Sequence, residues 1–88
     1  MILEQTIQHA YKTLKDSNIN SYQLDAEILL SNIMGVTREF LITNSNQKVT
    51  KDVIQKYLKA IERRKRNEPV AYITGTKEFW SNDFMVNQ

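Results

Sequence analysis

The stretch Ser21–Gly35, "SYQLDAEILLSNIMG", decides the fold. Its apolar residues cover more than half of a helical circumference: Leu24, Ala26, Ile28, Leu29, Leu30, Ile33 and Met34. A helix with so wide an apolar arc has to be buried on several sides, so we predict that it is the central helix of a bundle. We expect Asn20 or Ser21 to cap its start and Gly35 to end it in the left-handed conformation.

Amphipathic patterns flank this central helix. Apolar residues at helical spacing (Leu3, Ile7, Ala10, Tyr11 and Leu14) predict one helix over about residues 3–15. Thr50 is expected to cap a long helix with a buried stripe formed by Val53, Ile54, Tyr57, Leu58 and Ile61. Two short helices are also predicted. One follows Thr37 and turns Phe40 and Leu41 inward, and the other begins at Pro69, half-buries Tyr72 and ends at Gly75.

After Gly75 the apolar period changes from that of a helix to that of a strand. Two short alternating runs flank "SND", which is typical of a hairpin turn. The aromatic residues Phe79, Trp80 and Phe84 lie in these runs and need a surface to pack against. The predicted fold class is therefore all-α: a small bundle of about five helices, two of them short, over residues 1–74, followed by a β-hairpin linker over residues 75–88.

Length and composition restrict the class of protein. A chain of 88 residues forms one small domain, and without cysteine it has neither disulfides nor thiolate metal sites. The N-terminus has no basic region followed by a long apolar run, so it is neither a signal peptide nor a membrane span. We expect a cytoplasmic protein without membrane partners.

The sequence offers no catalytic, metal-binding or cofactor-binding set. His9 is the only histidine and is expected on the solvated side of its helix. Asp25 and Glu27 are two residues apart and point in different directions, so we interpret them as helix-surface or capping acids. The two glycines are forty residues apart, whereas a phosphate-binding loop needs several glycines close together. This chain alone is not expected to be an enzyme.

Positive charge is concentrated between Lys48 and Arg66, which hold eight basic residues against two acids. Two ion pairs at helical spacing are expected there, Asp52 with Lys56 and Glu62 with Arg66. The run Arg63, Arg64, Lys65 and Arg66 has two interpretations. It could contact phosphates or an acidic partner, or it could be a solvated helix end whose cations complement the helix dipole.

The segment "RRKRNEPVAYITGTKEFWSNDFMV", residues 63–86, resembles the junction between the helical and catalytic domains of the HemK/PrmC family. The resemblance rests on Arg64, Glu68-Pro69, Ala71-Tyr72-Ile73, Gly75, Phe79, Phe84 and Val86. Upstream, "LDAEILLSNIMGVTREFLI", residues 24–42, is similar to the family's Asp-Ala-Glu-hydrophobic-Leu-Leu segment. Together the two segments extend the resemblance over nearly the whole chain.

This resemblance implies a function. The family transfers a methyl group from S-adenosylmethionine to the glutamine of the Gly-Gly-Gln motif in peptide chain release factors. Its S-adenosylmethionine loop and its Asn-Pro-Pro-Tyr motif have no counterpart in this sequence. The resemblance therefore implies an excised substrate-recognition domain at residues 1–74 and a connector to a missing methyltransferase domain at residues 75–88.

The implied partners are that methyltransferase domain and a release factor. We predict release-factor contacts at the basic run, Arg63, Arg64, Lys65 and Arg66. The alternative that the residues leave open is a small helical domain that binds nucleic acid through the basic segment from Lys48 to Arg66.

Overall fold

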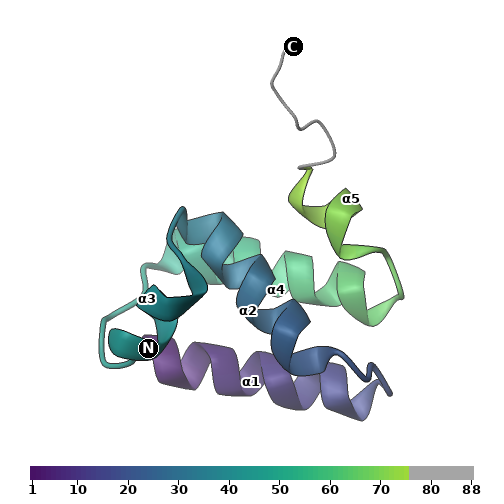
Figure 1. The fold of residues 1–88 in the computed structure, drawn as a ribbon, viewed down its shortest axis with the longest axis horizontal. Helices are drawn as coiled ribbons and strands as arrows, with labels where there is room; N and C mark the ends of the chain where they lie inside the picture. The colour runs from purple at the N-terminus through teal and green to yellow at the C-terminus, as the bar shows by residue number, and fades with distance from the viewer. Residues whose placement is uncertain (76–88) are drawn as a thin grey trace, which may run out of the picture.

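The computed structural model describes residues 1–75, which form five helices (Figure 1). These are α1 (Leu3–Asp16), α2 (Tyr22–Met34), α3 (Arg38–Thr43), α4 (Lys51–Lys65) and α5 (Val70–Thr74). The predicted helical class, including two short helices, is confirmed for this part of the chain. Apart from Gly75, the predicted hairpin lies outside the described residues.

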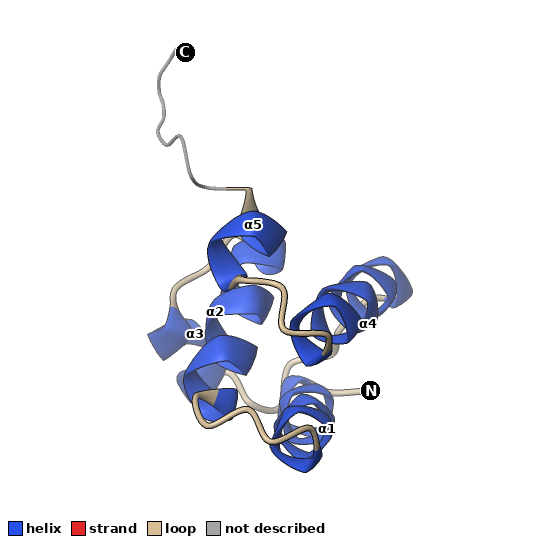
Figure 2. Ribbon diagram, turned by 90° about the vertical axis from the view of Figure 1, so that its right-hand side faces the viewer, coloured by secondary structure: helices blue, strands red, loops and turns tan. Residues whose placement is uncertain are grey.

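Helix α2 is central, as its wide apolar arc predicts. It contacts each of the other four helices, while α1 and α4 also contact one another and α5 contacts α4. In Figure 2, α1 and α4 are seen nearly end-on beside α2, and α5 lies at the opposite end of the view from α1. Ala26, Leu29 and Leu30 of α2 are buried where these helices meet. Because a central helix needs neighbours on every side, the fold follows largely from this one segment.

The N-terminus is joined by backbone hydrogen bonds to the loop between α3 and α4. Ile2 and Lys48 form an antiparallel bridge, and the Val49 N–H donates to the Met1 carbonyl at 2.9 Å. The Leu3 N–H donates to the Gln47 carbonyl at 2.8 Å. The first N–H groups of a helix have no partner within the helix, so these loop carbonyls complete the start of α1.

Most of the predicted helix ends are confirmed. Gly35 ends α2 at a φ of 70°, and the Val36 N–H reaches back to the Ser31 carbonyl at 3.0 Å. The Thr37 and Thr50 hydroxyls accept N–H groups at the starts of α3 and α4. The predicted cap of α2 is confirmed in position only: Ser21 is the N-cap residue but makes no side-chain capping bond, and Asn20 lies before the helix.

Several predictions of burial are wrong. Leu24 and Leu58, which were assigned to buried faces, are 44% and 46% exposed, and Tyr72 is 62% exposed. Ala60 and Ile19 are buried instead. Helical periodicity gives the angle of each residue around the helix axis, but the position of the neighbouring helices decides which edge of an apolar arc is covered.

Helix α5 begins one residue later than predicted, because Pro69 is extended and precedes it. Its Val70 and Ile73 side chains pack on the core, and Gly75 ends it at a φ of 68°. Within residues 1–75, none of the helices combines the length and the apolar character that crossing a bilayer requires.

Candidate partner-binding surface around α5

The basic run at the end of α4 contains one side chain that is largely buried. The side chain of Arg64 is 18% exposed, and its Nε donates to Asp25 Oδ2 at 2.8 Å. The Ser21 hydroxyl donates to the same Asp25 oxygen at 2.7 Å. Asp25 is only 6% exposed, so its interpretation as a helix-surface or capping acid is wrong. This buried pair joins the start of α2 to the end of α4.

The connector between α4 and α5 is held by the two adjacent arginines. Arg63 forms two hydrogen bonds with the Glu68 carboxylate, one of them from Nε to Oε1 at 2.9 Å, and these hold the pKa of Glu68 below its ordinary value. Arg64 Nη1 lies 3.4 Å from the Glu68 carbonyl oxygen. Asn67, which lies between Arg64 and Glu68 in the chain, takes the left-handed conformation with a φ of 70°, which asparagine tolerates better than most residues. The arginines thereby fix the direction in which α5 leaves the bundle.

The other two cations of the run lie at the surface. Arg66 pairs with Glu62 at 3.3 Å, and Asp52 pairs with Lys56 at 3.2 Å, as their spacing predicts. Lys65 is exposed and has no ion pair among residues 1–75. The run of four cations thus contains one largely buried arginine, Arg64, and three residues that solvent can reach, of which Arg63 also holds the connector to α5. Their contact with a partner stays a prediction.

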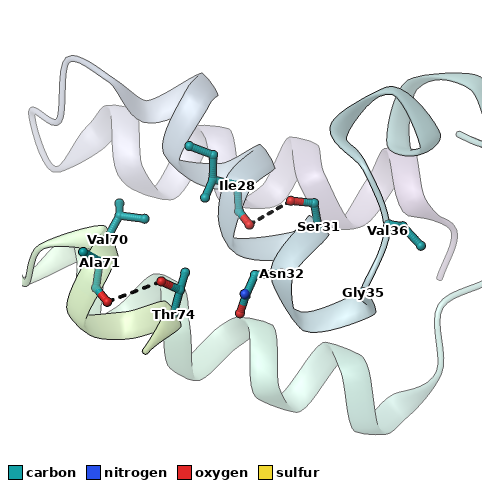
Figure 3. Close-up of a pocket in the computed structure, with 8 residues that line it drawn as sticks. All are labelled: Ile28, Ser31, Asn32, Gly35, Val36, Val70, Ala71 and Thr74. Atoms are coloured by element: carbon teal, nitrogen blue, oxygen red, sulfur yellow. Dashed lines mark hydrogen bonds between the residues drawn. The ribbon is translucent and has the colours of Figure 1, made fainter. Parts of the chain in front are cut away.

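One side of α5 borders a shallow groove of about 530 Å³, the α2–α5 groove (Figure 3). Helix α2 and the turn after it contribute Ile28, Ser31, Asn32, Gly35 and Val36, and α5 contributes Val70, Ala71 and Thr74. The Ser31 and Thr74 hydroxyls donate to carbonyls of their own helices, those of Ile28 and Ala71. The groove is lined by small or aliphatic side chains and by no charged group.

A second, smaller hollow of about 130 Å³ lies between α2, α4 and α5, and we call it the basic hollow. Its apolar lining comes from Leu29, Ile33, Ala60 and Ile73. Its polar lining comes from Asn32, Thr74 and three cations of α4, Lys56, Lys59 and Arg63. Asn32 and Thr74 line both hollows, so the two lie next to one another at the helix that leads to Gly75.

A polar cluster on α1, α2 and α3 joins helices but offers no reactive set. The Tyr11 hydroxyl donates to Glu27 Oε2 at 2.7 Å, and Arg38 donates to Glu27 Oε1 from both Nε and Nη2. Burial alone would raise the pKa of Glu27, but these hydrogen bonds outweigh it and hold that pKa below its ordinary value. His9 is exposed, as predicted, and residues 1–75 contain no cluster of acids and histidine arranged to hold a metal.

Sequence reasoning missed the Asp25–Arg64 pair because its members are 39 residues apart. One signal was present. Asp25 lies between Leu24 and Ala26 at the start of an apolar segment, where a buried carboxylate would require a cation from another helix.

Residues 5–75 match the family described as the PrmC N-terminal domain. The chain belongs to this family. The chain is 35% identical over 88 residues to the release factor glutamine methyltransferase of Clostridium botulinum, and this covers 100% of the chain and 31% of that relative. It is 38% identical over 87 residues to the enzyme of the same name from Koribacter versatilis, covering 99% of the chain and 31% of the relative.

A third relative is the bifunctional methyltransferase of Rickettsia conorii, which is 36% identical over 86 residues, 98% of the chain and 16% of the relative. No solved structure matches the chain. The chain thus spans a third or less of the length of these relatives, and the matches confirm the resemblance seen in its sequence.

Proposed function

We propose that residues 1–74 are the substrate-recognition domain of a release factor glutamine methyltransferase. The family match over residues 5–75, together with relatives of that name, carries the proposal. In this proposal the domain holds a release factor, and another part of a longer protein transfers a methyl group to the glutamine of its Gly-Gly-Gln motif. Residues 75–88 connect the two parts.

The methyl donor, S-adenosylmethionine, does not fit the two hollows beside α5. The donor carries an amino-acid end and a ribose, which need charged and hydrogen-bonding partners. The α2–α5 groove has no charged lining residue, and the polar hydroxyls of Ser31 and Thr74 already donate within their helices. The basic hollow, at about 130 Å³, is too small for a nucleoside. In our proposal the donor is bound outside the helical domain.

A rigid bundle contributes to such a reaction by binding its substrate away from the reacting atoms. Binding energy from remote contacts can position the reacting group and so increase the rate of the chemical step. Helix α5 suits this role because its packing and the two arginines fix its direction. A partner held beside α5 would be presented in a defined orientation to whatever follows Gly75.

The proposal is tested by titrating the 88-residue chain with the release factor encoded in the same genome, using isothermal titration calorimetry. Binding that survives replacement of the release factor's Gly-Gly-Gln glutamine by alanine would show recognition away from the reacting group, as we expect. The absence of any binding at 50 mM salt and 100 µM protein would contradict the proposal.

Nucleic-acid binding is the second candidate, because four lysines of the basic segment have no ion pair among residues 1–75: Lys48, Lys51, Lys59 and Lys65. Affinity for RNA or DNA that falls steeply between 50 and 200 mM salt would support this candidate. No binding at 50 mM salt would exclude it.

A further inference from the structure

Lys59 is an exposed cation for which the fold gives no structural role. No carboxylate lies within ion-pair distance of it in residues 1–75. It lies more than one turn before the end of α4, so it does not belong to the last-turn cations that complement the helix dipole, which are Arg63, Arg64 and Lys65. Its side chain lines the basic hollow. We propose that the basic hollow is a docking site for an acidic segment of the release factor, with Lys59 as its central contact.

The cations of the hollow are arranged in a row. Lys56, Lys59 and Arg63 are spaced at i, i+3 and i+7, so they lie along one side of α4. Opposite them, α2 and α5 supply the apolar residues Leu29, Ile33 and Ile73. A segment that crosses this end of the bundle would meet positive charge along one edge and an apolar depression beside it.

The acids near this row leave it positive. Asp52 pairs with Lys56 and Glu68 pairs with Arg63, whereas Lys59 is unbalanced. The Asp52–Lys56 pair is highly exposed, with side chains 72% and 64% accessible, so an incoming carboxylate can exchange for Asp52 at little cost. Glu62, the remaining acid on the exposed side of α4, pairs with Arg66. The row can therefore accept one or two carboxylates.

The shape of the hollow favours a peptide over a nucleic acid. Its volume of about 130 Å³ corresponds to about four water molecules at ~30 Å³ each, which is room for a single aliphatic side chain. No aromatic residue lines it, so it lacks the surface on which the bases of a single-stranded nucleic acid stack. Its occupant is therefore an acidic peptide segment with one aliphatic residue between its carboxylates. This inference rests on the proposed function, because it takes the release factor as the source of that segment.

The test compares two charge reversals on the same helix. Lys59→Glu changes the proposed contact. Lys51→Glu makes the same change at an exposed lysine of α4 that has no ion pair among residues 1–75, does not line the hollow and lies outside the basic run. Binding of the 88-residue chain to the release factor is measured by calorimetry at 50 and 150 mM salt, and circular dichroism checks that both variants fold. We expect Lys59→Glu to weaken binding at least fivefold at 50 mM salt and Lys51→Glu less than twofold.

A second variant tests the hollow from its other wall. Asn32→Asp places a carboxylate there and should also weaken binding at least threefold by repelling an acidic segment. The docking site is wrong if the wild-type chain binds and Lys59→Glu has no larger effect than Lys51→Glu, although the proposed function would then stand. Failure of the wild-type chain to bind overturns both. If Lys59→Glu weakens binding of a 20-nucleotide RNA and leaves release-factor binding unchanged, the proposed class of partner is wrong.

Discussion

Replacing Arg64 by alanine should destabilise the domain far more than replacing Arg66, although both arginines belong to the same basic run. Arg64→Ala leaves Asp25 buried, at 6% exposure, with the Ser21 hydroxyl as its remaining side-chain partner. It also removes the contact with the Glu68 carbonyl. Arg66→Ala breaks a pair whose side chains are 75% and 50% exposed.

The magnitudes follow from burial. Breaking a fully buried ion pair costs about 3–5 kcal/mol, because one charge is left without compensation. The side chain of Arg64 is 18% exposed, so water can partly replace it, and we expect about 2–4 kcal/mol. An exposed pair at i, i+4 contributes only about 0.3–0.5 kcal/mol. In a domain of this size a difference of about 2 kcal/mol lowers Tm by roughly 8–16 °C.

The assay is urea unfolding, monitored by circular dichroism at 222 nm. A double-mutant cycle compares the wild type with Arg64→Ala, with Asp25→Asn and with the variant that carries both changes. The double variant contains no uncompensated buried charge, so its free energy of unfolding should exceed the additive value by about 1–2 kcal/mol. The reasoning is refuted if Arg64→Ala and Arg66→Ala agree within about 0.5 kcal/mol, or if the effects of Asp25→Asn and Arg64→Ala simply add.

Three further changes test the fold. Because folding lowers the pKa of Glu27, the stability that this residue contributes is present above its unfolded pKa of about 4.3 and is lost as pH falls through the folded pKa. Glu27→Gln should therefore make the free energy of unfolding depend less on pH below about 4.3. An unchanged pH profile would contradict this. Leu30→Ala removes a side chain with 0% exposure and should cost about 2–5 kcal/mol in urea unfolding, so a cost below about 1 kcal/mol would place Leu30 outside the core. Gly35→Ala meets no atom within 4 Å but keeps a φ of 70°, so thermal unfolding should show a loss of about 1 kcal/mol, and a stabilised variant would refute the left-handed helix end.

The sequence predicted those features that depend on local pattern. The central position of α2 follows from its apolar arc, and the end of α2 at Gly35 follows from the conformational freedom of glycine. The start of α4 at Thr50 follows from the capping preference of threonine. These signals are contained within a few residues, so they can be read without knowing the fold.

Features that depend on contacts between distant helices could not be predicted in this way. Leu24 and Leu58 have apolar side chains at helical spacing, yet no neighbour covers them fully. Arg64 is adjacent to two exposed cations, and only the crossing of α2 and α4 shows that it is buried against Asp25. The partner contacts predicted at the basic run stay a prediction. Lys59 lies outside that run, and only the packing of α2, α4 and α5 shows that it lines the basic hollow.

The most direct test of the central claim, that the helical domain binds the substrate while chemistry occurs elsewhere, is a comparison of methylation rates. The enzyme is the longer protein that we propose to carry this domain, with and without residues 1–74. The substrates are the intact release factor and a short peptide containing its Gly-Gly-Gln motif. We predict that deletion lowers kcat/KM for the intact release factor at least tenfold and leaves the peptide rate within twofold. Equal rates for the intact release factor with and without residues 1–74 would contradict the claim.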